Sequence, residues 1–303
     1  MRETQFDARL VGLLRPISRA QLIPLPVLIV TVLPESPSAS SPLGVFDSGV
    51  GGLTVVRALR ELLPGESVIY LGDTARLPYG SKSPDTIRRF AVEDAQFLIA
   101  RGVKAVIVAC NTATAHALPL LESTFRVPVI GVLEPGVEAT LADTHCQRVG
   151  VIGTAGTIRS CAYQHRLAMR RPDLQIHAAA TPLLANFVEE GWVDHASTKM
   201  VLREYLKPLI EKGIDTLVLG CTHYPLLVPA IRRVVGQRVR LVDSASTCAA
   251  HVKSRLQTLG LLRPGKARPA LEIHLTDLSE QFENLARQFL GADFGKVKKA
   301  TLV

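Results

Sequence analysis

The sequence has few aromatic residues, no long apolar run and no regular pairing of its cysteines. Aromatic side chains make up 5% of the 303 residues, whereas aliphatic residues recur in short runs between glycines, which is typical of α/β proteins with buried parallel strands. No apolar run reaches the roughly 20 residues that a transmembrane helix needs. The length suffices for one large domain or two, and the alternation of runs favours two.

The five cysteines are an odd number and lie far apart, at positions 110, 146, 161, 221 and 248. This usage predicts reduced thiols and a cytoplasmic protein rather than a disulfide framework. The C-x-x-C and H-x-x-x-H spacings of many zinc sites are missing, so we expect no metal. The segment "GVGGLT" (49–54) lacks the third glycine of a dinucleotide-binding fingerprint, which removes the hint of an NAD cofactor.

Acidic residues are outnumbered, and the formal net charge is +8. From residue 251 onward, nine Lys and Arg face five Asp and Glu, but basic and aromatic residues do not alternate there and no nucleic-acid motif is present. We therefore expect a solvated basic surface and no nucleic-acid partner. Residues 1–40 form an extension that we interpret as disordered or as a misassigned start. A secretory signal is the alternative, because a basic start precedes a short apolar stretch there.

From residue 43 onward, short apolar runs alternate with segments of helical spacing. Strands are predicted at 43–48, 67–73, 105–110, 127–132, 148–154, 216–221 and 239–244, with helices at 83–102 and 278–291. Strands that alternate with helices predict a doubly wound parallel sheet, or two of them.

The chain also contains an internal repeat. "LIARGVKAVIVACNT" (98–112) aligns without a gap on "LIEKGIDTLVLGCTH" (209–223), and "LGVFDS" (43–48) aligns on "VGVIGT" (149–154). The repeat places Cys110 and Cys221 at equivalent strand ends. Because ligands bind at the carboxyl ends of strands in open α/β sheets, two such units facing each other would set the two thiols on opposite walls of one cleft.

Two thiols on opposite faces of a bound molecule suit the removal of a proton from one face of a carbon and its return to the other. A thiol of ordinary pKa is only about 3% ionised at pH 7, so each needs a partner. Asp47 ends the first strand, and His223 follows Cys221 by two residues. Hydrogen-bonding side chains in the strand-end turns are positioned to bind carboxylates; they are Ser48, Asn111, Thr112, Thr154 and Thr222.

Each residue also has a purely structural interpretation. A buried cysteine is usually a small hydrophobe, Asp47 and Ser48 are suited to cap a helix, and a lone histidine is often part of a core. The repeated cysteine with its polar follower favours chemistry for Cys110 and Cys221. The other three cysteines have no such neighbours, and we interpret Cys146, Cys161 and Cys248 as structural.

Taken together, these segments closely resemble the glutamate racemases, which are cofactor-independent. The resemblance covers residues 43 to about 291 and rests on "GVFDSGVGGLTV", "YLGDTARLPYGSKS", "ACNTATA", "IGTAGTIRS" and "LGCTHYPLL". It implies interconversion of L- and D-glutamate by two cysteines, which supplies D-glutamate for peptidoglycan. It also implies that neither pyridoxal phosphate nor a metal is used. Cys161 departs from the family pattern, in which a small residue such as glycine is more usual.

By this resemblance, Cys110 deprotonates D-glutamate with help from Asp47, and Cys221 deprotonates L-glutamate with help from His223. A glutamate of "ANFVEEGW" is also implied; Glu189 is favoured over Glu190. The substrate would be held by Asp47, Ser48, Tyr79, Gly80, Asn111, Thr112, Thr154, Thr222 and His223.

The resemblance further implies two similar doubly wound α/β domains with the active site in the cleft between them. The first would comprise residues 41–134 plus 244–303, with the helix at 278–291 packed on it, and the second residues 135–243. It leaves a homodimer open and predicts no membrane partner. The rival functions are an aspartate-specific racemase of the same superfamily, a two-lobed binding protein for anionic amino acids and, from charge alone, nucleic-acid binding.

Overall fold

Two parallel β-sheets organise the chain. The computed structural model describes residues 38–143, 147–264, 269–278, 282–291, 294 and 297–302, and all of these fall within one compact unit. The extension interpreted from residues 1–40 lies almost entirely outside the described residues, as does Cys146. In the described part of the chain, no helix is both long enough and apolar enough to cross a bilayer.

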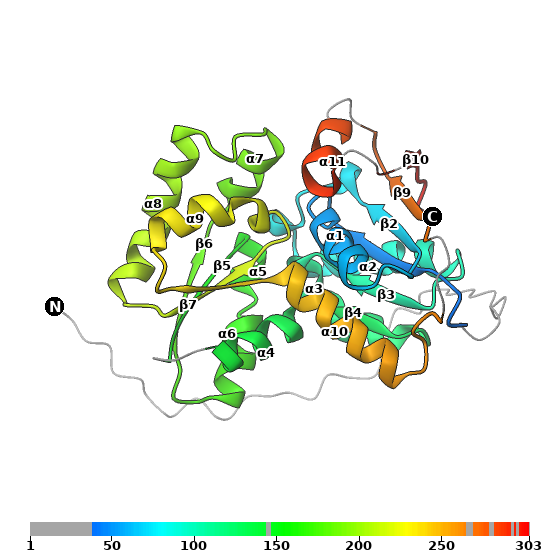
Figure 1. The fold of residues 1–303 in the computed structure, drawn as a ribbon, viewed down its shortest axis with the longest axis horizontal. Helices are drawn as coiled ribbons and strands as arrows, with labels where there is room; N and C mark the ends of the chain where they lie inside the picture. The colour runs from blue at the N-terminus through cyan, green and yellow to red at the C-terminus, as the bar shows by residue number, and fades with distance from the viewer. Residues whose placement is uncertain are drawn as a thin grey trace, which may run out of the picture. The chain divides into compact units, whose positions relative to one another are not determined.

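The elements alternate as the sequence predicts (Figure 1). The strands are β1 (Leu43–Asp47), β2 (Val68–Gly72), β3 (Ala105–Val108), β4 (Val129–Gly131), β5 (Arg148–Gly153), β6 (Gln175–Ala180), β7 (Thr216–Gly220), β8 (Arg240–Asp243), β9 (Leu271–Leu275) and β10 (Val297–Lys299). The α-helices are α1 (Leu53–Leu62), α2 (Pro84–Ile99), α3 (Asn111–Thr124), α4 (Leu133–Asp143), α5 (Ala155–Arg159), α6 (Ala162–Arg170), α7 (Leu183–Glu189), α8 (Ala196–Glu211), α9 (Val228–Val235), α10 (Ser244–Thr258) and α11 (Phe282–Leu290). Short 3₁₀ turns are η2 (Thr74–Arg76), η3 (Tyr79–Ser81) and η4 (Tyr224–Leu227).

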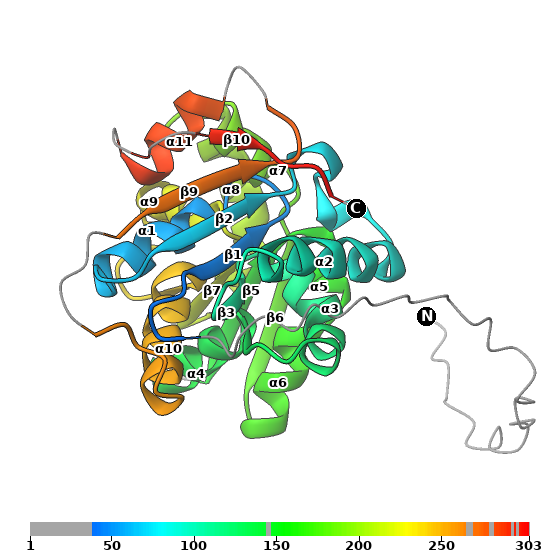
Figure 2. The same cartoon turned by 90° about the vertical axis from the view of Figure 1, so that its right-hand side faces the viewer.

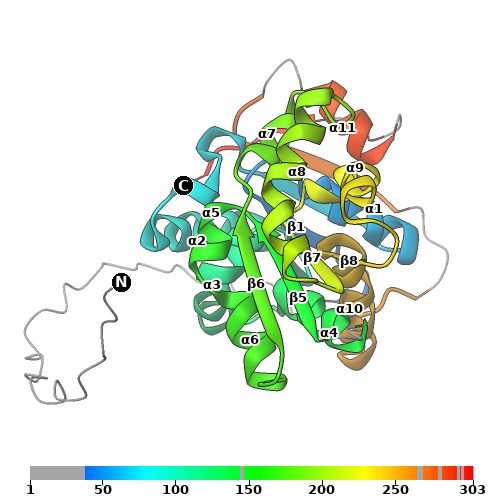
Figure 3. The same ribbon diagram turned by 90° about the vertical axis from the view of Figure 1, so that its left-hand side faces the viewer.

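The two sheets repeat one topology. The first has the strand order β10-β9-β2-β1-β3-β4 and the second β6-β5-β7-β8, with every pair parallel. In both, the first strand along the chain lies between the second and the third, so β3 is equivalent to β7. Figure 3 shows β5 between β6 and β7. The shared order confirms the internal repeat and the α/β fold class.

Helices cover both faces of the first sheet, and its central strand β1 is therefore buried on both sides. Val45 of β1 belongs to the same apolar cluster as Leu53 and Leu59 of α1. Phe46, the next residue, belongs to the cluster that contains Leu98 of α2 and helix α3 residues. Successive side chains of a strand point to opposite faces, so one short apolar run fixes helices on both sides.

Matching turns precede the two equivalent strands. Gly102 between α2 and β3 has φ +71°, and Gly213 between α8 and β7 has φ +66°. Only glycine adopts this left-handed conformation without steric cost, which explains why glycine recurs in the repeat. Cys161 has φ +53°, which is also a left-handed conformation that glycine favours. This backbone explains why a small residue such as glycine is more usual at this position in the family.

The C-terminal segment returns to the first sheet. β9 pairs with β2, and β10 pairs with β9; Figure 2 shows these two strands, in orange and red, continuing the sheet beyond β2. Helix α11 contacts α1, as the sequence predicts. Its Phe289 ring also lies edge-on to the ring of His223, with centroids 5.9 Å apart. The segment therefore reaches the strand end that carries Cys221.

Candidate active site

A cavity of about 280 Å³ lies at the carboxyl ends of both sheets. Ser48 follows β1 and Cys110 follows β3 in the first sheet, while Thr154 follows β5 and Cys221 follows β7 in the second. These are the points where strand order reverses, at which open α/β sheets bind ligands. The volume is just below the roughly 300–1,000 Å³ of ligand pockets, so it suits a small molecule rather than a dinucleotide.

Nearly every residue that the sequence singled out lines this cavity. They are Ser48, Tyr79, Gly80, Cys110, Asn111, Thr112, Thr154, Glu189, Cys221, Thr222 and His223. Asp47 is the exception: its side chain is fully buried just behind the wall. Both of the candidate glutamates, Glu189 and Glu190, reach the cavity.

Cys110 lies at the N-terminus of helix α3. Its Sγ accepts a hydrogen bond from the backbone N–H of Ala113 at 3.4 Å and donates to Ser48 Oγ at 3.6 Å. Burial, with the nearby Asp47 carboxylate adding to it, raises the pKa of the Cys110 thiol to about 12, although the Ala113 N–H and Ser48 oppose this. Cys110 is therefore a thiol at neutral pH in the ligand-free protein.

Cys221 has a different partner. Nδ1 of His223 lies 3.6 Å from Cys221 Sγ, and Nε2 lies 2.9 Å from Glu189 Oε1. Burial alone would lower the pKa of His223, but the hydrogen bonds to Cys221 and Glu189 outweigh it and raise the pKa to about 10. A positively charged imidazole thus lies next to the Cys221 sulfur, where it can stabilise negative charge that develops during a reaction.

Asp47 connects the two halves of the site. Its carboxylate accepts hydrogen bonds from the Gly49 N–H at 3.1 Å and from Thr222 Oγ1 at 3.3 Å. Burial raises its pKa, against the lowering effect of His223 and these donors. Within the described residues, its hydrogen bonds go to the turn and to Thr222 rather than to Cys110 Sγ. Its action on Cys110 in the ligand-free protein is therefore electrostatic.

The polar wall near Cys110 is held by side chains from both sheets. The Thr112 hydroxyl lies 2.8 Å from that of Thr154. Asn111 accepts from the Tyr163 hydroxyl at 2.8 Å and donates to Ser244 Oγ at 3.3 Å. With its amide fixed from both ends, Asn111 presents its second N–H in one direction, which is what a positioning group for a carboxylate needs.

Tyr79 and Gly80 reach the cavity from the loop between β2 and α2. The Tyr79 hydroxyl is bonded to Asp73 and Asp94, so it is engaged within the protein. A Cβ at Gly80 would lie 2.6 Å from Thr154 Cβ. The close packing of this loop on Thr154 therefore depends on glycine, and the loop forms a wall between the two sheets.

Some lining residues escaped the sequence analysis: Gly49, Leu77, Pro78, Ala185, Asn186 and Gly220. Leu77 and Pro78 lie in the polar loop 71–83, whose apolar members carry no chemical signal. Ala185 and Asn186 precede Glu189 by one helical turn on α7, and helical spacing from that glutamate could have found them. Among the described residues, no cluster of three His, Cys, Asp or Glu is arranged to hold a metal ion.

The fold and the site together define a protein in which two thiols line one small cavity at the switch points of a duplicated α/β unit. Residues 52–252 match the family model described as Asp/Glu/Hydantoin racemase. The glutamate racemase of Geobacter metallireducens is 46% identical over 260 residues, which are 86% of this chain and 96% of the relative.

Solved structures agree with this match. A glutamate racemase isoform of Bacillus anthracis superposes with a TM-score of 0.83 at 39% identity, covering 86% of this chain and 98% of that one. The glutamate racemase of Francisella tularensis, solved in complex with D-glutamate, superposes with a TM-score of 0.81 at 36% identity, covering 87% and 98%. The chain thus belongs to the Asp/Glu/Hydantoin racemase family and, within it, to the glutamate racemases.

Proposed function

We propose that this protein interconverts L- and D-glutamate by moving the Cα proton between two cysteines. One observation carries the proposal: Cys110 and Cys221, at equivalent ends of β3 and β7, line one small cavity. A purely structural role gives no reason for a repeated cysteine to face the same cavity from both sheets. Glutamate is favoured over aspartate because relatives named glutamate racemase align with this chain over almost their full length.

In the proposed reaction, one cysteine thiolate takes the Cα proton and the other thiol gives its proton to the opposite face. By resemblance, Cys221 acts on L-glutamate and Cys110 on D-glutamate, and each turnover exchanges their protonation. His223 with Glu189 would stabilise the charge at Cys221, and Asp47 would act at Cys110. Hydroxyl, amide and backbone donors around the cavity would stabilise the carbanion as its charge moves onto the carboxylate; they are Ser48, Asn111, Thr112, Thr154 and Thr222.

We further infer a place in peptidoglycan synthesis in the cytoplasm, by resemblance to the family. The four described cysteines are free thiols, which is consistent with a reducing compartment. The division into residues 41–134 plus 244–303 and 135–243 also stays a proposal; the membership of the two sheets supports it. Glutamate is the proposed small-molecule partner, and a homodimer stays open.

Proton NMR in deuterated water tests the reaction. With D-glutamate and L-glutamate in separate samples of chelator-treated protein, the Cα proton signal and the optical rotation should both decay from either enantiomer. Aspartate at the same concentration should react much more slowly. Faster reaction of aspartate would favour the rival racemase, and binding without exchange would favour a binding protein.

Variants connect the exchange to the thiols. Cys110→Ala and Cys221→Ala should each lower racemisation at least ~10³-fold, because the step on one face loses its acid or base. The matched control is Cys248→Ala, since Cys248 is a fully buried thiol outside the cavity. Normal turnover in either cavity variant would refute the two-thiol mechanism.

A further inference from the structure

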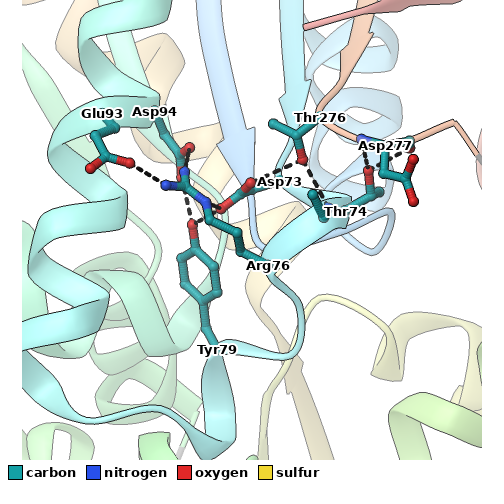
Figure 4. A network of polar contacts seen from close by, with 9 residues as sticks. Asp73, Thr74, Arg76, Tyr79, Glu93, Asp94, Thr276 and Asp277 are labelled. Carbon is teal, nitrogen blue, oxygen red and sulfur yellow. Dashed lines mark hydrogen bonds and ion pairs between the residues drawn. The ribbon is translucent and has the colours of Figure 1, made fainter. Parts of the chain in front are cut away.

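Asp94 is a fully buried carboxyl group next to the wall of the cavity. It lies on α2 with its side chain wholly shielded from solvent, and it faces Asp73, Arg76 and Tyr79 from the segment after β2. Figure 4 shows these side chains pointing toward one another, with Glu93 beside Arg76. The mechanism proposed above uses none of the four charged groups.

The charges in this cluster do not balance if all of its carboxyl groups are ionised. The Arg76 guanidinium is the only cation that bonds to them within the described residues. It pairs with Asp73 Oδ2 at 2.6 Å, with Asp94 Oδ1 at 3.0 Å and with Glu93. Three carboxylates against one guanidinium leave two uncompensated negative charges, and Asp73 and Asp94 are both buried. Burial of unpaired charge is costly.

The hydrogen-bonding pattern of the cluster also indicates that one of its carboxyl groups carries a proton. The Tyr79 hydroxyl carries one proton but contacts two carboxyl groups, Asp73 Oδ2 and, at 2.8 Å, Asp94 Oδ2. It can donate to only one of them. Asp73 already accepts from Arg76 at Oδ2 and from Thr276 Oγ1 at Oδ1, the latter at 3.0 Å, so both of its oxygens are engaged as acceptors. The contact with Asp94 becomes a hydrogen bond if Asp94 carries a proton and donates it to the Tyr79 oxygen.

Tyr79 transmits this arrangement to the cavity. Its ring is buried, while residues 77–80 line the cavity wall. The next residue, Gly80, packs so closely on Thr154 that a Cβ would lie 2.6 Å from the threonine Cβ. A small shift of the Tyr79 ring would therefore move the wall against Thr154, on the side of the second sheet.

We propose that Asp94 is a positioning residue that is held protonated, and that its proton fixes Tyr79 and thereby the 77–80 wall of the substrate cavity. The part of this proposal that concerns substrate rests on the proposed glutamate racemisation. The part that concerns the proton and the wall stands on the geometry of the cluster.

The electrostatic surroundings agree with the geometry. Burial, followed by the nearby Asp73 carboxylate, raises the pKa of Asp94 well above its ordinary value, although Arg76 and Tyr79 oppose this. Glu93 adds to the rise from the same helix.

A pair of substitutions separates the proton from the bulk of the side chain. Asp94→Asn keeps a donor toward Tyr79 and an acceptor toward Arg76, so KM and kcat for D-glutamate should stay within about twofold of wild type. Asp94→Ala removes both, and KM should rise about tenfold with a smaller change in kcat. Asp85→Asn, at the exposed start of the same helix, is the matched control and should change neither constant.

Two readouts do not depend on racemisation. In infrared difference spectra at neutral pH, Asp94→Asn should remove a protonated-carboxyl C=O band; loss of ionised-carboxylate bands instead would overturn the proposal. Amide hydrogen exchange of a peptide spanning residues 77–80 should accelerate in Asp94→Ala and not in Asp94→Asn. Equal acceleration in both variants, or in neither, would also overturn it. If wild type fails to racemise glutamate while both readouts hold, the proposed function fails and the role of Asp94 in the wall stands.

Discussion

At the scale of single residues, the two cavity thiols are alike in position and unlike in surroundings. Both are about 95% buried. Cys110 lies near a carboxylate, and its pKa is raised to about 12. Cys221 lies next to His223, whose own pKa of about 10 keeps the imidazole charged at neutral pH. The ligand-free protein therefore holds a protonated thiol at Cys110 and a positively charged imidazole next to Cys221.

This difference predicts which thiol reacts first. A small alkylating agent such as iodoacetamide attacks the thiolate, so at pH 7 it should label Cys221 before Cys110. Peptide mass spectrometry at partial modification measures the ratio, which we expect to exceed about tenfold. Cys248 serves as the internal control, because burial raises its pKa to about 12 and it should stay unlabelled.

His223→Asn tests the cause of the preference. The amide cannot carry a positive charge, so the ratio of Cys221 to Cys110 labelling should fall toward one. Preferential labelling of Cys110 in the wild-type protein would contradict the electrostatic difference between the surroundings of the two thiols.

The sequence was informative about these residues only where a pattern repeats. Cys110 and Cys221 could be found because they occupy the same place in two aligned segments. Asp47 could be found because it ends the first strand of the same unit, and His223 because it follows Cys221 by two residues. Asp94 could not be found in this way. It lies 21 residues from Asp73, on a helix of ordinary amphipathic spacing, and its partners meet it only when the loop folds back on α2.

At the scale of elements, the glycine-rich turn between β1 and α1 joins the two halves of the site. It carries Gly49 and Gly51, and its conformation is fixed by a hydrogen bond from the Tyr70 hydroxyl to the Gly49 carbonyl at 2.7 Å. A Cβ at Gly51 would lie 2.4 Å from Thr222 Oγ1 and 2.5 Å from the His223 ring. This turn of the first sheet thus packs directly on the residues that follow Cys221.

Gly51→Ala should therefore impair the chemistry of Cys221. The methyl group must displace Thr222 or His223, and misplacement of a catalytic group by about 1 Å can cost about 10²-fold in rate. We expect kcat to fall by about that factor. Gly49→Ala is the control in the same turn, since its Cβ would have no neighbour closer than 3.7 Å, and its effect should be far smaller. Equal effects of the two substitutions would mean that the close approach at Gly51 is not what matters.

Strand prediction succeeded where a strand has a clear apolar run and failed where polar or small residues interrupt it. Every strand predicted from an apolar run is present, from β1 to β5 and at β7 and β8. β6, β9 and β10 were not predicted. β6 ("QIHAAA") and β10 ("VKK") are edge strands with exposed positions, and such strands are short or polar because an apolar edge promotes aggregation. β9 carries a glutamate and a histidine among its apolar residues, which hides its run.

At the scale of the whole molecule, several buried ionisable groups make the folded protein less stable as pH rises. The pKa of His223 is raised from 6.5 to about 10, so its contribution is complete below pH 6.5 and is lost as pH rises to about 10. Asp47 and Asp94 also have raised pKa values. Both groups bind protons more tightly in the folded protein than in the unfolded chain, so their contributions to stability are also lost as pH rises through their folded pKa values. Cys110 and Cys248 add to this above pH 9.

We therefore expect the thermal unfolding midpoint to fall steadily between pH 6.5 and pH 10, by roughly 2–4 °C for each kcal/mol lost. Differential scanning fluorimetry at constant ionic strength measures it. His223→Asn should flatten the decline, because the variant has no imidazole to titrate in that window. His116→Asn should leave the slope above about pH 7.5 unchanged: burial lowers the pKa of His116 below 6.5, so above about pH 7.5 this residue is neutral in both the folded and the unfolded chain. A midpoint that stays constant or rises over this range would show that His223 is not charged in the folded protein, and the expected preference for labelling at Cys221 would lose its physical basis.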